Sequence, residues 1–198
     1  MDDLDALFAR AGSGRPYDDL APALIAARAR TVEACEAYAA SRGRPQGERE
    51  AVLRAFLRQV GEGAHFEPTF RCEFGRNISI GAAFYGNFDC VILDAAPVTI
   101  GAHVLFGPRV GLYSADHALD PDERAAGVCV AAPITIGDRV WLGGGVQVTK
   151  GVTIGAGTVV AAGAVVSRDL PAGVLAAGVP ARVLRPITSQ DRLGYRPR

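Results

Sequence analysis

The sequence has little of several features that mark common functional classes. Lys and Arg together number 21, as do Asp and Glu, so no charge excess favours a nucleic acid or a membrane surface as partner. No apolar run approaches the length of a membrane span, and the acidic start Met1-Asp2-Asp3 is unlike a signal peptide. Four cysteines are scattered without a C-x-x-C motif, at Cys35, Cys72, Cys90 and Cys129. We interpret them as reduced core or loop residues of a cytoplasmic protein.

What the sequence has in quantity is glycine, with 24 residues, and aliphatic residues at every sixth position of its second half. These positions, most of them followed by Gly or Ala, are Ile136, Leu142, Val148, Ile154, Val160 and Val166. No α-helix or flat sheet has a period of six, so the spacing predicts repeats that stack into a solenoid. We favour this fold over a β-sandwich, because a sandwich does not require strict spacing of six.

The same spacing is present upstream, with a shift of two residues at Ile100-Gly101. Each six-residue unit is expected to form a short strand and a turn, and three units to close one triangular coil. The aliphatic residues should then point inward and stack from coil to coil. Residues 64–186 are therefore predicted to form an all-β solenoid, a parallel β-helix of hexapeptide repeats.

Residues 1–63 are predicted to form an α-helical cap over one end of the solenoid. We expect three helices. The first is short and lies near residues 4–8, and the apolar face of the third extends to Val60. The second helix should be capped by Asp18 or Asp19. Its expected apolar stripe is Ile25, Ala29, Val32, Cys35 and Ala39. A second hypothesis is that the start of the cap reaches the active site.

Residues 113–132 interrupt the repeat and are the predicted active-site loop, because a long excursion from a rigid scaffold usually serves a function. The loop contains His117, one of only three histidines. A histidine with a pKa near neutrality suits a general base that acts on a hydroxyl group. Acidic neighbours are expected to orient the ring, namely Asp116, Asp120, Asp122 and Glu123. The alternative is an exposed loop histidine without a role.

Several ordered segments then carry a resemblance to a known family. They are residues 67–75 (EPTFRCEFG), 87–94 (NFDCVILD), the pair Asp116-His117, residues 136–145 (IGDRVWLGGG) and residues 177–185 (AGVPARVLR). Together with the helical cap, they resemble the hexapeptide-repeat acyltransferases, specifically the maltose and galactoside O-acetyltransferase group. The resemblance implies a left-handed parallel β-helix, an exception to right-handed crossovers. It also implies a homotrimer with active sites between neighbouring subunits.

The resemblance further implies acetyl-CoA as donor, a sugar hydroxyl as acceptor and no metal. His117 matches the catalytic base, and the backbone N–H of Gly144 matches a donor to the tetrahedral oxyanion. Asn87 matches a sugar-binding asparagine, although an asparagine in a solenoid turn is common. Asp94 is expected to bind the acceptor or to orient His117; the carboxylate that follows in galactoside enzymes is replaced here by Ala95.

Two more acceptor residues and the coenzyme site follow from the same resemblance. Glu73 and Asp19 match positions near the sugar, with helix capping as the alternative for Asp19. The residues that match the coenzyme site are Ala162, the pair Ser167-Arg168, Arg182, Arg185 and Trp141. Trp141 is expected to line the coenzyme tunnel or to pack between subunits. The basic tail, residues 187–198, is interpreted as solvated surface, including Arg192, Arg196 and Arg198.

Three other functions were weighed against a sugar acetyltransferase. A γ-type carbonic anhydrase needs three zinc-binding histidines, and the spacing of His65, His103 and His117 does not suit that site. An acetyltransferase that acts on a xenobiotic or an amino sugar is the nearest alternative. A solenoid scaffold without chemistry is the non-enzymatic one. The sequence does not specify the acceptor, the hydroxyl position or the preferred acyl length.

Overall fold

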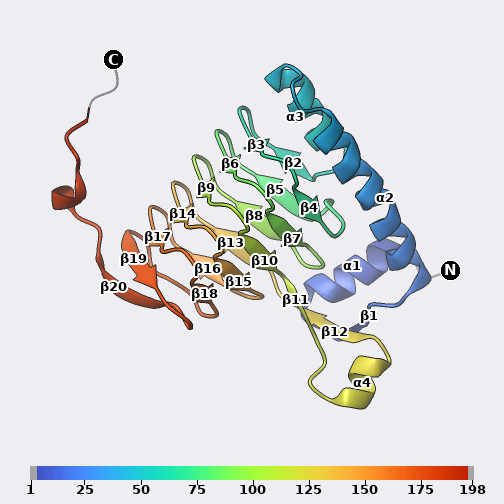
Figure 1. Ribbon diagram of the computed structural model, residues 1–198. Helices are drawn as coiled ribbons and strands as arrows, with labels where there is room; N and C mark the ends of the chain where they lie inside the picture. Colours follow the sequence, from blue (N-terminus) through green and yellow to red (C-terminus); the bar gives the residue numbers. More distant parts are fainter. Residues whose placement is uncertain (1–3, 196–198) are drawn as a thin grey trace.

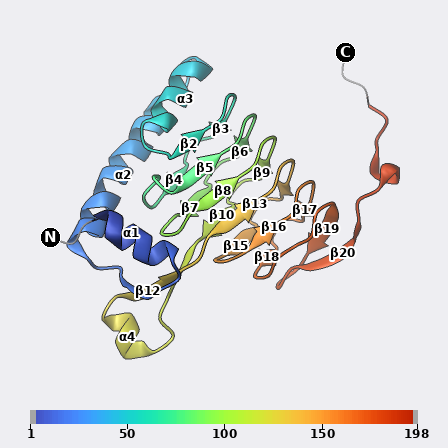
Figure 2. The same ribbon diagram turned by 180° about the vertical axis from the view of Figure 1, so that it is seen from behind.

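The computed structural model describes residues 4–195, and the view from behind shows the same arrangement (Figures 1 and 2). The acidic start and the tail residues Arg196 and Arg198 lie outside the described part. Helices cover one end of a solenoid, and a tail leaves the opposite end, with one 3-10 turn, η1 (Ser189–Asp191). No helix in the described residues is both long and apolar enough to cross a membrane.

Three parallel sheets form the walls of the solenoid. Wall 1 contains β2 (Gln59–Val60), β5 (Ile78–Ile80), β8 (Val98–Ile100), β13 (Ile134–Ile136) and β16 (Thr153–Ile154). Wall 2 contains β3 (His65–Phe66), β6 (Tyr85–Gly86), β9 (Leu105–Phe106), β14 (Trp141–Leu142), β17 (Val159–Val160), β19 (Val174–Ala177) and the antiparallel β20 (Arg182–Pro186). Wall 3 contains β4 (Arg71–Cys72), β7 (Val91–Leu93), β10 (Gly111–Tyr113), β15 (Gln147–Thr149) and β18 (Val165–Val166).

The chain visits the walls in the order 1, 2, 3, so three strands close one coil, and the solenoid has about six turns. The predicted fold class, a left-handed parallel β-helix of hexapeptide repeats with a helical cap, is thereby confirmed. Its first strand is β2, within the range 1–63 that the sequence assigned to the cap. Residues of the repeat stack in register, as Ile136 does on Ile154. Their side chains are fully buried or nearly so, which makes the aliphatic column the core of the solenoid.

The shift of frame at Ile100 has a simple geometric cause. Ile136 and Ile154, which are neighbours in register, lie 18 residues apart, whereas Ile80 and Ile100 lie 20 apart. The two additional residues sit in the corner where wall 3 passes to wall 1, at residues 94–97. The loop that contains His117 leaves the solenoid at the same corner one coil later, after β10. This corner therefore positions the site.

The cap consists of α1 (Leu4–Gly12), α2 (Pro22–Ala40) and α3 (Gln46–Arg54). Tyr38 and Leu53 join the core of the solenoid, so α2 and α3 close its end as expected. Of the predicted stripe of α2, Cys35 is buried as expected, whereas Ile25 and Val32 are 53% and 50% exposed. The buried face of α2 is completed by Leu24, Ala27, Thr31 and Tyr38, none of which was in the predicted stripe.

Two predicted helix boundaries in the cap also differ from the structure. The N-cap of α2 is Ala21, without a side-chain hydrogen bond, so neither Asp18 nor Asp19 caps this helix. The third helix ends at Arg54, and Val60 lies in β2, the first strand of wall 1.

The predicted active-site loop is folded rather than irregular. It forms a hairpin of β11 (Ala115–His117) and β12 (Val128–Ala131) with a short helix between them, α4 (Pro121–Ala125). Strand β1 (Tyr17–Asp18), from the cap, pairs with β12 to complete a three-stranded sheet. The hairpin projects from the side of the solenoid in both views (Figures 1 and 2). The start of the cap thus reaches the loop that contains His117.

Candidate functional site

His117 lies in a row of side chains that crosses the small sheet. Cys129 is the register partner of His117 on one side and of Tyr17 on the other, so the three side chains share one face. The Sγ atom of Cys129 lies 3.1 Å from Nδ1 of His117. Nδ1 therefore faces the sheet, and the imidazole, which is exposed, keeps Nε2 for a ligand.

The acidic neighbours do not orient the ring as the sequence predicted. Asp116 forms an ion pair with Lys150, the only lysine of the sequence, at 2.5 Å. Asp120 caps α4 by accepting hydrogen bonds from two backbone N–H groups, and the two other acids lie on α4 itself. Cys129 takes the place that the prediction gave to these carboxylates.

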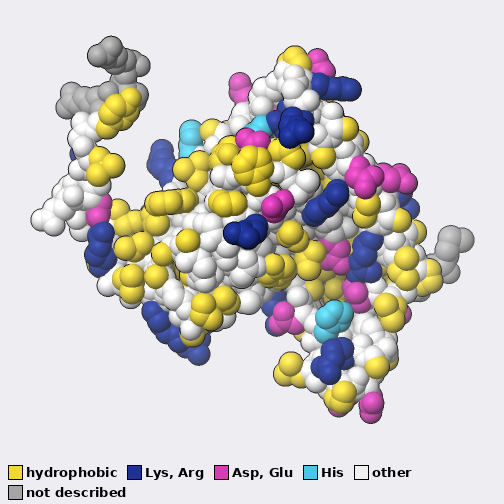
Figure 3. Space-filling view, in the orientation of Figure 1, with side chains coloured by type: hydrophobic (Ala, Val, Ile, Leu, Met, Phe, Trp, Pro, Cys, Tyr) yellow, Lys and Arg dark blue, Asp and Glu magenta, His cyan; other side chains and the backbone are white. Residues whose placement is uncertain are grey.

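A pocket of about 460 Å³ opens beside His117. Asp116 and Lys150 line it with Pro16 from the cap and apolar side chains of the hairpin, among them Val130. Acidic, basic and histidine side chains gather at the base of the projecting loop (Figure 3). The cavity has both the polar groups that bind hydroxyls and an apolar wall.

A charged cluster links the cap to the first coil close to this sheet. Nε of Arg28, on α2, donates to Glu73 at 2.8 Å, and the same guanidinium pairs with the carboxylate of Asp19. The side chains are only 25%, 15% and 20% exposed for Arg28, Glu73 and Asp19. Since Asp19 N–H bonds to Gly127 O beside β12, the two predicted acceptor carboxylates lie together near the hairpin.

Glu73 gives the cluster a pH-dependent contribution to stability. Burial raises the pKa of Glu73 to about 7 from 4.5, although Arg28 opposes the shift. A carboxyl with a raised pKa stabilises the fold fully below its unfolded pKa and loses that contribution as pH rises through the folded value. We expect the melting temperature of the wild-type protein to fall more between pH 5 and pH 8 than the melting temperature of Glu73→Gln does. Parallel profiles for the two proteins would contradict this, and Glu33→Gln, an exposed change on helix α2, is the matched control.

Asp94 is fully buried in the corner between walls 3 and 1. Its carboxylate accepts hydrogen bonds from the backbone N–H groups of Phe74, Gly75 and Asn77 at 2.8, 3.1 and 3.2 Å. Burial raises the pKa of Asp94, and these bonds oppose the shift. In this chain Asp94 therefore braces the corner that carries Glu73, and its carboxylate contacts backbone rather than His117.

A second set of predicted residues lies at a different corner. Asn87, Gly144 and Ala162 follow β6, β14 and β17, where wall 2 passes to wall 3. The carbonyl of Gly144 accepts from Gly163, whereas its N–H donates to no backbone carbonyl within the described residues. One chain thus does not bring these three residues together with His117.

The predicted coenzyme residues occupy three places. Ser167 and Arg168 follow β18 at the same corner as the loop, two coils further on, and Trp141 is 52% exposed on wall 2. Arg182 and Arg185 lie on β20 opposite Ala177 and Leu175, with a bulge between them. Because those partners are two residues apart, the bulge places both arginines on one face. Arg185 pairs with Asp191 through two hydrogen bonds.

Sequence reasoning missed Tyr17, Arg28 and Cys129. Their contacts join residues more than 40 positions apart or cross a hairpin. No repeat in the local sequence predicts such contacts. The histidines required for the carbonic anhydrase alternative are not assembled, since His65 is on β3 and His103 is in the turn before β9. Within residues 4–195 no three His, Cys, Asp or Glu side chains form a metal-binding group.

Comparison with known proteins agrees with the geometry. Residues 10–61 match the maltose acetyltransferase hexapeptide capping motif, and residues 133–168 match the bacterial transferase hexapeptide model of six repeats. Nodulation protein L of Rhizobium meliloti (strain 1021) is 54% identical over 66% of this chain and 72% of its own length. Galactoside O-acetyltransferase of Escherichia coli (strain K12) is 38% identical over 75% of this chain and 73% of its own length.

Two solved structures extend the similarity over almost the whole chain. A maltose O-acetyltransferase from Clostridium difficile 630 superposes with a TM-score of 0.88 at 34% identity, covering 92% of this chain and 98% of that one. A hexapeptide-repeat acetyltransferase of Vibrio cholerae O1 biovar eltor, solved with acetyl coenzyme A, gives 0.82 at 38% identity, covering 91% and 98%. The capping motif, the repeats and these relatives together show that the chain belongs to the hexapeptide-repeat acyltransferases, in the maltose and galactoside O-acetyltransferase family.

Proposed function

We propose that this acetyltransferase moves the acetyl group of acetyl-CoA to a hydroxyl of a sugar, with His117 as general base. The observation that carries the proposal is the row Tyr17–Cys129–His117, because it joins the loop histidine to the cap strand that precedes Asp19, and Asp19 shares Arg28 with Glu73. Carboxylates and a guanidinium are the groups that hold sugar hydroxyls by hydrogen bonds. The acetyl-CoA complex of the Vibrio cholerae relative supports the donor.

In the proposed reaction, Nδ1 of His117 faces Cys129 and Nε2 acts on the acceptor hydroxyl. With its proton on Nδ1, directed at Sγ, the neutral ring of His117 has a lone pair on Nε2. Nε2 takes the hydroxyl proton while the sugar oxygen attacks the thioester carbonyl. The tetrahedral oxyanion accepts from the N–H of Gly144, and its collapse expels the coenzyme A thiolate, which takes the proton from His117. The products are the acetyl ester and the free thiol, and no acyl-enzyme forms.

This reaction needs a second copy of the chain. His117 and the cap cluster lie at the corner from wall 3 to wall 1, whereas Asn87, Gly144 and Ala162 lie at the corner from wall 2 to wall 3. We propose a homotrimer in which the first corner of one protomer meets the second corner of its neighbour. Closed threefold symmetry then builds three identical sites from two half-sites each.

The proposal is tested by thiol release from acetyl-CoA with a panel of acceptors. The panel contains maltose, glucose, galactosides and matched amino sugars, and the products are resolved to identify the acetylated atom. Release with sugars and formation of O-acetyl esters is the expected result. N-acetyl products alone would contradict the hydroxyl acceptor. Normal trimers that release no thiol, whichever acceptor is added, would indicate a scaffold instead.

We expect Arg182 and Arg185 to bind the 3′-phosphate of the coenzyme, since both lie on one exposed face of β20. Loss of a charge-assisted hydrogen bond in Arg182→Ala or Arg185→Ala should raise the KM for acetyl-CoA by about tenfold. The KM for acetyl-dephospho-CoA should change much less. Equal effects on both donors would place the arginines away from that phosphate, and Arg192→Ala, in the exposed tail, is the control.

A further inference from the structure

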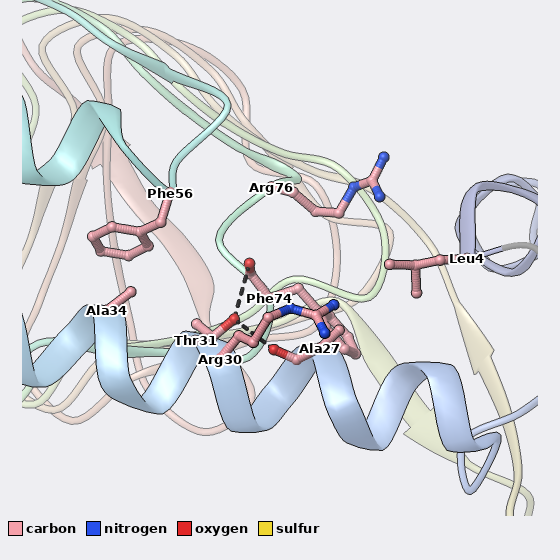
Figure 4. A pocket seen from close by; sticks show the side chains of 8 residues that line it. All are labelled: Leu4, Ala27, Arg30, Thr31, Ala34, Phe56, Phe74 and Arg76. Carbon is pink, nitrogen blue, oxygen red and sulfur yellow. Dashed lines mark hydrogen bonds between the residues drawn. The ribbon is translucent and has the colours of Figure 1, made fainter.

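Helix α2 contacts the first coil through one continuous face. Its hydroxyl-bearing residues anchor it: Thr31 donates to the carbonyl of Phe74 at 3.2 Å, and Tyr38 donates to that of Phe66 at 2.9 Å. Figure 4 shows Thr31 directed from α2 toward Phe74, with Phe56 and Arg76 on the same side of the helix. The helix is therefore fixed against the coil at points on both sides of Cys35.

Between these anchors, two thiols from the cap and the solenoid meet. Sγ of Cys35 lies 3.8 Å from Sγ of Cys72, on β4. Cys35 is 1% exposed, whereas Cys72 is partly exposed and gives small molecules access to the pair. A disulfide needs a sulfur–sulfur distance of ~2.0 Å, so the sulfur atoms need to approach by roughly 2 Å.

The environment of the pair also makes its thiols more readily oxidised than the thiols of the two other cysteines. The hydrogen bond from Cys72 lowers the pKa of Cys35 to about 7. Burial raises the pKa of Cys90 and of Cys129 to about 11. Since the thiolate is the reactive form, oxidation should begin at Cys35.

We propose that Cys35 and Cys72 are a site of reversible oxidation, at which hydrogen peroxide converts two thiols into a disulfide that fastens α2 to the first coil. The Cys35 thiolate attacks one peroxide oxygen, which forms the sulfenic acid and releases hydroxide. The Cys72 thiol then displaces that oxygen, so one disulfide forms and the peroxide is reduced to two water molecules. Two equivalents of a small thiol reverse the reaction.

The expected consequence is a tethered cap. The bond joins residues 37 positions apart, and the closed loop raises the melting temperature by roughly 5–10 °C through loss of unfolded-state entropy. It also holds Arg28, two turns earlier on α2, against Glu73. The disulfide is detected by mass and by melting temperature and not by acetyl transfer. Its test can therefore fail or succeed independently of the test of the proposed function.

The experiment treats the full chain with peroxide and measures intact mass, the cross-linked peptides and the melting temperature. We expect a loss of about 2 Da, a peptide that joins Cys35 to Cys72, and a higher melting temperature that dithiothreitol reverses. Cys35→Ser and, separately, Cys72→Ser should abolish all three, whereas Cys90→Ser should keep them. Oxygen adducts without the loss of 2 Da, or a disulfide between two chains, would overturn the proposal.

Discussion

Replacement of His117 with alanine is expected to lower kcat by about 10²–10⁴-fold, the usual contribution of a positioned general base. Nε2 of His117 is the nitrogen left free by the contact between Nδ1 and Cys129. Without it, the acceptor hydroxyl attacks as a neutral and therefore weak nucleophile. The measurement is thiol release at saturating acetyl-CoA and acceptor.

The control for this variant has to separate chemistry from assembly. Native mass and the affinity for acetyl-CoA should be nearly unchanged in His117→Ala, because the side chain is exposed and belongs to no core cluster. His103→Asn, at an exposed turn of positive φ that asparagine tolerates, should retain wild-type rates. A His117→Ala protein that turns over within a factor of about three of wild type would reject the assignment.

The largest expected effect on stability comes from a single methyl group between two coils. A Cβ atom on Gly137 would lie 2.6 Å from the backbone nitrogen of Ala156, in the coil that follows. The backbone of a stacked coil has no flexible side chain that can yield, so Gly137→Ala must separate the coils. We expect a loss of roughly 3 kcal/mol in the free energy of unfolding, measured by denaturant titration.

Gly47→Ala is the matched control for this change. Gly47 lies in helix α3, and nothing lies within 4 Å of the position of its Cβ atom. Alanine is a better helix former than glycine, so this variant should gain about 0.5–1 kcal/mol. Similar losses in both variants, or an unaffected Gly137→Ala, would show that the coils are not packed as closely as described.

The solenoid was predictable because its information is local. Ile136 and the residues six apart from it repeat one environment, and any window of the second half shows the period. Even the frame shift at Ile100 was visible in the sequence. Its cause, a longer corner from wall 3 to wall 1, became clear only when the strands were assigned to walls.

The orientation of α2 was not predictable for the opposite reason. The helix has alanines on every side, so apolar periodicity selects no face. Because Ile25 and Val32 are large and apolar, the prediction assigned the buried side of the helix to a face that is exposed. What decides the buried face is contact with the first coil, through Thr31 and Tyr38. These contacts are made with residues of the solenoid far along the chain.

The candidate site divides in the same way. His117 was identified because it lies in the one long interruption of the repeat. Its neighbours Cys129 and Tyr17 depend on the pairing of β12 with β11 across the hairpin and with β1, whose residues lie more than 100 positions earlier in the chain. Acidic residues near in sequence were therefore the wrong candidates to orient the ring, and a cysteine interpreted as a core or loop residue is the one that contacts it.

The central claim is that His117 of one protomer works with Asn87 and Gly144 of the next, and mixing two impaired variants tests it most directly. His117→Ala and Asn87→Ala chains are to be co-expressed at equal levels, purified as mixed assemblies and assayed by thiol release. Random assembly gives an intact pair of half-sites at about a quarter of the interfaces, so we predict recovery of about a quarter of wild-type activity. Mixed assemblies no more active than the separate variants, or an Asn87→Ala protein as active as wild type, would contradict the account.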